Sequence, residues 1–381
     1  MMKYPIIKSV STLLVVIQMA VTGLYGEILH REQPNYAEHL PHIVSKYRLI
    51  EIADTQLDAS MLTNLPSKLT HAPIINQQGQ VIGNTLSGGF AVIPSKKWEY
   101  TPRINGIMIH VHGINAKGDL LVTLNRGNDS QEWMLWPLTQ KGYGAVRNHI
   151  QTIDPFQPNV SFTGYNDNGI FIGYKKIDGR NRPYVWTMEK GFHLLGAEKG
   201  LQITGIAKEI NQKGSIAGIT DDATDKVPFL WHDQAGLETL RKYRNALVPK
   251  GWVEFSDIIL TEDDTIYGTF WIRHQNDENE KGRQYYAFRW EPNHAKVQMV
   301  DLRGMRLAAA NSRHLLVGSY EGKAMVREPD KLPIALSELI DPQTLEGWVL
   351  LEATSVNDQG QIVGYGMHNG KVHVFLADPT S

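Results

Sequence analysis

The chain has no cysteine among its 381 residues, and this absence excludes several kinds of site. Disulfides cannot stabilise the fold, and neither thiolate metal ligands nor a cysteine nucleophile is available. Excess charge is also lacking, because 38 basic residues stand against 40 acidic ones and the formal net charge is −2. Nucleic-acid binding would need clustered excess Lys and Arg, so we expect no nucleic-acid partner.

Long apolar runs are missing as well, with one short exception near the beginning. The segment TLLVVIQMAV (12–21) follows Lys3 and Lys8 and precedes Gly23 and Gly26. A basic start, about ten apolar residues and then small residues are typical of a secretory signal peptide. The run is too short to span a bilayer comfortably. We therefore expect cleavage near Gly23 or Gly26, no stable membrane span afterwards, and a secreted or periplasmic product.

One short motif is abundant, and its clearest copy is SVNDQGQIVGYG (355–366). In each copy a polar turn is followed by a short apolar strand, which usually ends on glycine. Seven copies start 39 to 51 residues apart, a spacing typical of solenoids, propellers and arrays. Their first polar positions are Asn76, Asn115, Asn166, Asn211, Thr261, Asn311 and Asn357.

The residue types in this motif suit a tight turn. An asparagine at the first position can hydrogen-bond its own backbone two residues on, and glycine at the fourth allows a positive φ. We therefore predict purely structural turns at these positions: Asn76, Gly79, Asn115, Gly118, Asn166, Gly169, Asn211, Gly214, Asn357 and Gly360. Asp264 and His314 replace the glycine in two copies, so those turns should be strained or differently built.

Further apolar strands accompany each turn. A lead-in strand precedes it, an aromatic-rich strand such as PYVWT (183–187) follows, and several copies add a weaker fourth run. Four strands in each of seven repeats describe a seven-bladed β-propeller, and no helical periodicity of useful length competes after residue 30. A four-residue turn joins only adjacent antiparallel strands, so each motif turn should lie inside a blade.

The last repeat lacks its fourth strand, because the chain ends soon after HVFLAD (373–378). A spare strand, KYRLIEIAD (46–54), precedes the first complete repeat. Pairing the two would close the ring and remove exposed sheet edges. The prediction is thus an all-β fold: a signal peptide (1–26), a lead-in segment (27–45) and one seven-bladed β-propeller (46–381), closed by its N-terminal strand.

The pattern I-N-x-x-G-x-I-V-G, followed by strands such as YAF (286–288) and HVF (373–375), resembles the HAF-repeat proteins, a group of extracellular bacterial repeat proteins. The resemblance covers residues 46 to 378. Other copies depart from the name-giving tripeptide, with YVW and PFLW in its place. The resemblance implies an exported propeller and supplies no catalytic residues.

Four tryptophans occupy matching ends of the third strands. Two interpretations exist: aromatic platforms for sugars, or wedges between blades. Repetition at one structural position favours wedges. The four residues are Trp136, Trp186, Trp231 and Trp290.

Candidate metal sites are weak. His110 and His112 share a face of a lead-in strand and could supply two zinc ligands, but no third ligand is identifiable. A hydrogen-bonded strand pair is the favoured interpretation. TDDATD (220–225) and HQNDENEKGRQ (274–284) lack the ligand spacing of a calcium loop, so we expect solvated hairpin tips. No catalytic residue, metal site or cofactor is predicted.

Function should lie on the face of the ring opposite the short turns, where long and varied loops gather, because variable loops on a rigid scaffold usually carry recognition. We expect an exported, non-enzymatic binding scaffold, monomeric, with an unknown protein or glycan ligand. The predicted binding residues are Tyr143, Arg147, His149, Trp271, Arg273 and His274. For Trp271 the alternative is that it continues its strand and packs against the next blade.

Two other functions remain open. A carbohydrate-active hydrolase or lyase would use carboxylates that meet only in space. A secreted factor acting on a host protein does not differ from the first hypothesis in sequence. Grouped Asp and Glu on the loop-rich face would favour the enzyme, and scattered aromatic and Arg side chains would favour binding.

Overall fold

The computed structural model describes residues 46–58, 72–86, 88–92, 99–100, 109–125, 131–138, 151–153, 160–221, 226–243, 247, 252–273 and 284–380. The chain separates into two units, Met1–Val44 and Ser45–Ser381, and every described residue belongs to the second unit. The predicted signal peptide and nearly all of the lead-in segment fall in the first unit, outside the described residues. Within the described part, no helix has the length and apolar character needed to cross a membrane.

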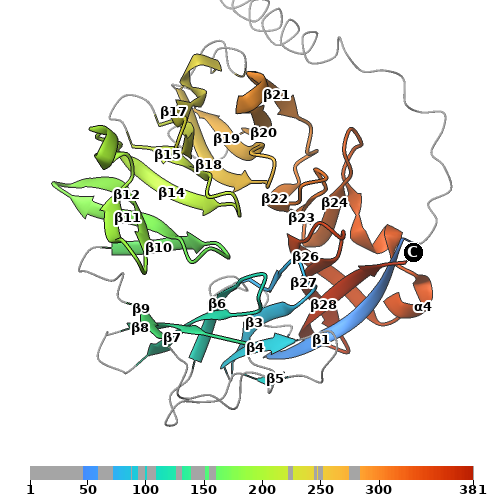
Figure 1. The fold of residues 1–381 in the computed structure, drawn as a ribbon. Helices are drawn as coiled ribbons and strands as arrows, with labels where there is room; N and C mark the ends of the chain where they lie inside the picture. Colours follow the sequence, from blue (N-terminus) through green and yellow to red (C-terminus); the bar gives the residue numbers. More distant parts are fainter. Residues whose placement is uncertain are drawn as a thin grey trace, which may run out of the picture. The chain divides into compact units, whose positions relative to one another are not determined.

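The second unit is a seven-bladed β-propeller, as predicted, with seven four-stranded antiparallel sheets (Figure 1). Blades 1 to 3 comprise β2 (Ile74–Ile75), β3 (Val81–Thr85), β4 (Gly88–Val92) and β5 (Glu99–Tyr100); β6 (Ile109–Ile114), β7 (Leu120–Asn125), β8 (Gln131–Trp136) and β9 (Gln151–Ile153); and β10 (Val160–Tyr165), β11 (Phe171–Ile177), β12 (Arg180–Thr187) and β13 (Gly191–Leu194).

Blades 4 to 6 repeat the same strand order. They comprise β14 (Gly205–Ile210), β15 (Ile216–Thr220), β16 (Pro228–His232) and β17 (Gly236–Thr239); β18 (Trp252–Leu260), β19 (Ile266–Arg273), β20 (Gln284–Glu291) and β21 (Lys296–Val300); and β22 (Arg306–Ala310), β23 (Leu316–Tyr320), β24 (Lys323–Arg327) and β25 (Ile334–Ala335). Short helices lie between some of the blades and strands, among them η3 (Ala197–Lys199), η7 (Leu336–Leu339) and α4 (Pro342–Leu345).

Blade 7 joins the two ends of the propeller sequence. It consists of β26 (Trp348–Val356), β27 (Ile362–His368), β28 (Lys371–Pro379) and β1 (Tyr47–Asp58), in that order. β1 lies beside β28 (Figure 1) and runs antiparallel to it. In this pairing Asp54 lies opposite His373. The predicted ring closure is therefore confirmed.

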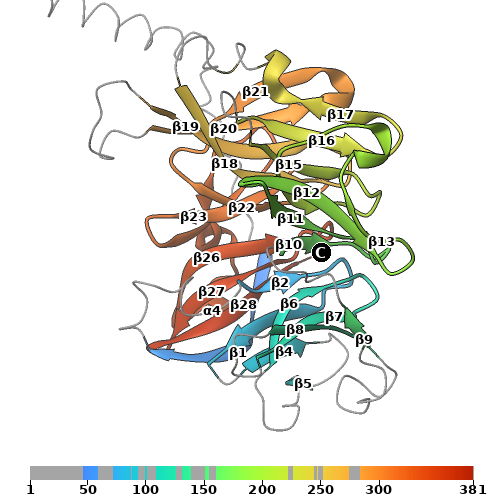
Figure 2. The same cartoon turned by 90° about the vertical axis from the view of Figure 1, so that its left-hand side faces the viewer.

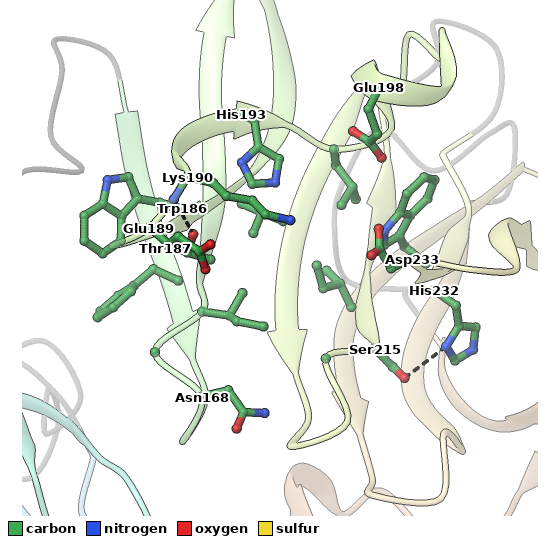
Figure 3. A pocket seen from close by; sticks show the side chains of 18 of the residues that line it. Asn168, Trp186, Thr187, Glu189, Lys190, His193, Glu198, Ser215, His232 and Asp233 are labelled. Atoms are coloured by element: carbon green, nitrogen blue, oxygen red, sulfur yellow. Dashed lines mark hydrogen bonds between the residues drawn. The ribbon is translucent and has the colours of Figure 1, made fainter.

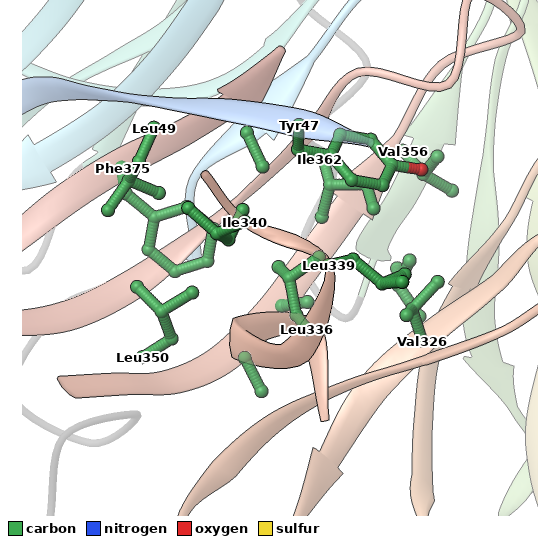
Figure 4. Close-up of a cluster of buried hydrophobic side chains, with 14 residues drawn as sticks. Tyr47, Leu49, Val326, Leu336, Leu339, Ile340, Leu350, Val356, Ile362 and Phe375 are labelled. Carbon is green, nitrogen blue, oxygen red and sulfur yellow. The ribbon is translucent and has the colours of Figure 1, made fainter. Parts of the chain in front are cut away.

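Apolar side chains anchor this closing strand. Tyr47 and Leu49 of β1 are buried in a cluster with Leu339 of η7, Ile340 and Phe375 of β28 (Figure 4). The backbone adds hydrogen bonds, including one from the Asp341 N–H to the Tyr47 carbonyl at 2.8 Å. The N-terminal strand is thus part of the core between blades 6 and 7.

All seven motif turns connect the first and second strands of a blade. The N–H of the fourth residue donates to the carbonyl of the first, as from Gly79 to Asn76 at 3.0 Å. The Asn76 side-chain oxygen accepts from the N–H groups of Gln78 and Gln80, at 3.1 and 2.9 Å. These contacts are the local hydrogen bonds that the sequence predicts.

The same asparagines also connect neighbouring blades. Nδ2 of Asn166 donates to the carbonyl of Asn211, the equivalent residue of the next blade, at 3.0 Å. The same link runs from Asn76 to Asn115, from Asn211 to Thr261, from Asn311 to Asn357 and from Asn357 to Asn76. We call this series of linked turns the turn belt.

In five copies the residue after the asparagine adds a second link to the next blade. The Asp167 N–H, for example, donates to the side-chain oxygen of Gln212 in the next blade at 2.8 Å. The other such links run from Ala116 to Asp167, from Gln212 to Glu262, from Ser312 to Asp358 and from Asp358 to Gln77. The repeated motif is therefore explained by contacts between blades as well as within turns.

The two turns without glycine keep the same fold under strain. Asp264 and His314 occupy the fourth position with φ of 69° and 61°. Asp264 gains a compensating contact, because its Oδ1 accepts from Nδ2 of Asn211 at 2.8 Å. The prediction of strained turns is confirmed.

The glycine that ends the motif strand permits a close backbone approach. A Cβ atom on Gly173 would come within 1.9 Å of the Ser161 carbonyl oxygen, where the first strand of blade 3 bulges. Beside this bulge, Thr163 donates its hydroxyl to the Ala207 carbonyl of blade 4 at 2.7 Å. Glycine here therefore permits the bulged inner strand and its contact with the next blade.

Three of the four tryptophans behave as wedges. Trp136, Trp231 and Trp290 are buried, with at most 3% of their surface exposed. Trp186 differs, since it is only half-buried and packs edge-on against Phe171 at 5.3 Å.

Candidate functional site

Most of the predicted loop-face residues lie outside the described residues, namely Tyr143, Arg147, His149 and His274. Trp271 and Arg273 belong to β19, and Trp271 is 8% exposed between Glu254 of β18 and Tyr285 of β20. Trp271 thus continues its strand and presents little surface. The loop-face site as a set stays a prediction.

The described residues form a cleft on the opposite face, where the turns lie. It has a volume of about 1020 Å³ and extends over blades 3 and 4, which lie next to each other in Figure 2. Two kinds of turn line it: the motif turns at Asn168 and Lys213, and the turns between third and fourth strands at Glu189 and Asp233. Both kinds lie on the same face because successive strands of a blade alternate in direction.

The deeper lining of the cleft is apolar and aromatic. Phe171 and Val185 come from blade 3, Ile216 and Trp231 come from blade 4, and all four are buried. Trp186 adds a half-exposed ring at the blade 3 side (Figure 3). Apolar walls with a partly exposed indole can bury part of a ligand.

Charged side chains surround this lining. Figure 3 shows Glu189 and Lys190 on one side of the cleft, with Glu198 and Asp233 on the other. All four are exposed, as is Lys213, so the rim carries both signs of charge. Met188 stands beside Glu189 with 63% of its surface exposed, so the rim also offers apolar surface.

The wall on the blade 4 side is fixed by a lysine. Lys199 of η3 donates to the Asp233 carbonyl, and its ammonium lies 5.0 Å from the centre of the Trp231 ring. Gly196 begins this segment with φ of 76°, and a Cβ atom there would approach Trp231 to 3.3 Å. The segment between blades 3 and 4 is thus held against the cleft by specific contacts.

A serine and a histidine meet in the cleft, with Ser215 Oγ 3.0 Å from His232 Nδ1 (Figure 3). The pair resembles a nucleophile and its base, but Ser215 is only 3% exposed. Blade 7 has the same link at equivalent positions, where Nε2 of Gln361 donates to Oδ1 of Asp378 at 2.8 Å. The Ser215–His232 contact therefore occupies the position at which blade 7 has a structural hydrogen bond between its motif turn and its third strand.

One carboxyl on an inner strand has a shifted pKa. Burial raises the pKa of Glu209 in β14 from 4.5 to about 7, and the neighbouring Lys208 ammonium partly opposes this rise. The side chain is nevertheless exposed to water. Lys208 itself donates to the Ser256 carbonyl of blade 5.

The predicted histidine pair is a structural feature. His112 Nε2 lies 2.7 Å from Thr123 Oγ1, and its ring packs on Trp133 at 4.4 Å. Burial lowers the pKa of His110. The favoured interpretation of a hydrogen-bonded strand histidine is confirmed for His112. Residues 222–225 and 274–283, in the two charged segments, lie outside the described residues.

Sequence reasoning missed the cleft because it considered only the motif turns on this face. The turns that join third and fourth strands, TMEKG (187–191) and HDQAG (232–236), carry three of its rim charges, Glu189, Lys190 and Asp233. Their placement on this face follows from the alternating direction of successive strands, which could have been inferred from the sequence. The position of η3, in contrast, depends on packing between blades.

No family model matches the chain, and no curated protein matches it, so the HAF-repeat resemblance stays a prediction. Solved structures do align over much of its length. A catalytically inactive virginiamycin B lyase from Staphylococcus aureus with quinupristin is 12% identical over 87% of this chain and 99% of its own, with a TM-score of 0.46. YCF48 from Cyanidioschyzon merolae is 11% identical over 87% and 98%, with a TM-score of 0.44.

The β-propeller domain of the trilobed protease from Pyrococcus furiosus is also similar. It is 11% identical over 71% of this chain and 84% of its own, with a TM-score of 0.43. That domain is described as having an open velcro topology. In the present chain β1 pairs with β28, so the N-terminal strand completes the last blade and closes the ring.

Proposed function

We propose that the protein is an exported, non-enzymatic binding module that holds an extended segment of a partner protein in the cleft of blades 3 and 4. The observation that carries the proposal is the cleft itself, with its apolar lining and its rim of both charges. The propeller fold alone does not determine function, so function must be argued from the site.

The composition of the cleft favours a peptide segment over a highly charged ligand. Protein interfaces combine an apolar centre with a polar rim, and aromatic side chains often anchor them. Trp186 and Met188 offer apolar surface, while Glu189, Lys190 and Lys213 can pair with charges of either sign. A partner segment with apolar side chains and mixed charges matches this surface.

The only serine–histidine contact in the cleft lining does not support serine-dependent hydrolysis there. Ser215 is buried and takes part in a link that recurs in blade 7. The carbohydrate-active alternative predicts turnover of a glycan panel by the wild-type protein, and the binding proposal predicts none.

Export rests on residues 1–26, whose basic start and short apolar run are typical of a signal peptide. N-terminal sequencing of the native protein should find a mature chain that begins after Gly23 or Gly26, outside the cytoplasm. An intact Met1 in a cytosolic fraction would contradict this part of the proposal.

Site-specific photocrosslinking tests the location of binding. A photoreactive phenylalanine analogue replaces Met188 at the cleft and, as a control, Val349 of blade 7, which is similarly exposed at 58%. A third variant carries the probe at position 273, where β19 ends on the loop-rich face. The chains are produced in their native cell and irradiated in place.

The proposal expects an adduct of discrete mass at position 188 and none at position 349. Equal adducts at both positions would indicate nonspecific contact. An adduct at position 273 without one at position 188 would support the loop-rich face and overturn the cleft.

A further inference from the structure

Three side chains from distant parts of the sequence meet on blade 7. Glu51 comes from β1, His368 from the end of β27 and His373 from β28. One ligand atom from each residue can be chosen so that all three atoms lie within 4.8 Å of one another. Strand pairing brings them together, because β1 lies beside β28 and β28 lies beside β27.

The distances within this cluster suit a shared cation. Nδ1 of His368 is 3.0 Å from one Glu51 carboxylate oxygen, and Nδ1 of His373 is 3.0 Å from the other. Ligand atoms around a tetrahedral zinc ion are about 3.4 Å apart, given metal–ligand bonds of about 2.1 Å. Small side-chain rotations would therefore convert the cluster into a coordination shell.

His373 has an unsatisfied nitrogen, although Glu51 is close. Its side chain is 9% exposed, and Nδ1 makes no hydrogen bond despite its 3.0 Å distance from the carboxylate. A buried polar atom without a hydrogen bond is costly and needs an explanation. A cation between the two groups would provide one, because the nitrogen lone pair would then point at the metal.

Neighbouring groups hold the His368 ring in place. Trp348 stacks on it with a centroid distance of 4.6 Å and an interplanar angle of 8°. Nδ2 of the Asn369 amide lies 3.4 Å from Nε2, on the side of the ring away from Glu51. Metal-bound histidines commonly donate their second ring N–H to an oxygen, which fixes ring orientation. With Nδ1 on a metal, Nε2 would carry the proton, and the Asn369 amide would have to turn so that its oxygen faces Nε2.

Glycine at position 366 makes room for this arrangement. A Cβ atom there would come within 2.9 Å of the Trp348 ring. The residue lies opposite His373 in the β27–β28 pairing, so the tryptophan is seated across the same hairpin that carries both histidines. Glu51 and His368 remain accessible, with side-chain exposures of 44% and 24%.

We propose that Glu51, His368 and His373 bind a divalent transition-metal ion, with zinc the best match. Two imidazoles and one carboxylate form a recurrent zinc ligand set, and solvent access leaves a position for water. Since Glu51 belongs to the N-terminal strand and both histidines to the C-terminal hairpin, the ion fastens the ring closure. This site is independent of the cleft on blades 3 and 4.

The test uses untagged full-length protein, freed of metal by chelation and dialysis. Zn²⁺ is titrated by calorimetry, and Co²⁺ is followed by its visible absorption. The expected result is one equivalent of metal per chain and a higher melting temperature with Zn²⁺, because a ligand that binds the folded state stabilises it. Hydrogen exchange of the β1 amides should also slow.

Variants separate this site from other histidines. Glu51→Gln and His368→Gln are each expected to weaken Zn²⁺ binding by at least about tenfold and to remove the stabilisation. His294→Gln is the matched control, since His294 pairs with Glu291 at 3.3 Å and lacks a second histidine. It should leave binding unchanged. The metal-free melting temperature of each variant shows that it is folded.

Two results would overturn the site. One is the absence of saturable, stoichiometric Zn²⁺ binding to the wild-type protein. The other is equal affinity in the wild type, Glu51→Gln and His368→Gln, which would place the metal elsewhere.

Discussion

In five of the six asparagine turns, the side-chain amide of the asparagine joins two blades at a buried position. Asn166 shows the full set: its oxygen accepts from the N–H groups of Asn168 and Ile170, and its nitrogen donates to the Asn211 carbonyl. The residue is 1% exposed, so no water can replace these bonds. Asparagine suits this position better than aspartate or serine, because its amide offers an acceptor oxygen and a separate NH2 donor at the same time. A carboxylate only accepts, and a hydroxyl must use one oxygen for both roles.

Replacing Asn166 by Ala should therefore destabilise the fold. Three hydrogen bonds are lost at roughly 1 kcal/mol each, so we expect a decrease of about 3 kcal/mol in the free energy of unfolding. Urea unfolding at 25 °C measures it. A change below about 0.5 kcal/mol would show that the turn belt adds little stability.

The fifth blade offers the opposite change. Thr261 cannot donate an amide to Asn311, although its turn has the same backbone hydrogen bonds. Thr261→Asn should complete this link and raise the free energy of unfolding by about 1 kcal/mol. The same urea measurement applies, and Thr261→Ala is the control. Equal stability of the two variants would contradict a role for the amide between blades.

Glu209 should make stability depend on pH. Its pKa is raised to about 7 by burial, so between pH 4.5 and 7 the folded state binds more protons than the unfolded state. The free energy of unfolding therefore falls as pH rises through this interval. Glu209→Gln should remove that dependence. Its free energy of unfolding should exceed that of the wild type above pH 7, and this advantage should be smaller near pH 5. A difference that stays constant from pH 5 to 8 would refute this.

Among the structural elements, β1 is the one that closes the ring. Its buried side chains include Tyr47, Leu49 and Ile52, and the Thr55 hydroxyl donates to the Val372 carbonyl at 2.7 Å. Without β1, β28 would become an exposed edge that can pair with other chains. The strand thus contributes both core packing and protection against aggregation.

Deletion of residues 46–58 should prevent stable folding. Loss of three large apolar side chains alone removes about 5–8 kcal/mol, comparable with the total stability of many domains. Urea unfolding and size-exclusion chromatography measure the effect. A matched chain that begins at residue 46 should unfold like the full chain. Equal stability of the two truncated chains would show that β1 is dispensable.

Elements built from local patterns were predictable from sequence. The motif turns, the strands around them and the pairing of residues 46–54 with 373–378 follow from alternation, turn chemistry and the count of strands. The links between blades were not predictable, because Asn166 and Asn211 are far apart in sequence and no local pattern indicates that they are in contact. Likewise Glu51 carries no signal as a metal ligand until β1 is placed beside β28.

At the scale of the whole molecule, the two faces of the propeller differ in what they present. The turn face combines the belt around the ring with the cleft on blades 3 and 4, where Met188, Glu189 and Lys190 project from one turn. On the loop-rich face, most of the residues that sequence analysis predicts for binding lie outside the described part of the chain. The cleft is therefore the site that the described residues support.

The central claim, binding in the cleft, is tested most directly by affinity for the partner identified by crosslinking at position 188. The cleft variant exchanges the charges of one turn, Glu189→Lys with Lys190→Glu. The control makes the same exchange in blade 6, Glu321→Lys with Lys323→Glu, where both residues are also exposed. We predict a Kd at least tenfold weaker for the cleft variant, an unchanged Kd for the control and unchanged melting temperatures for both. Equal affinity of the wild type and the cleft variant would contradict the account.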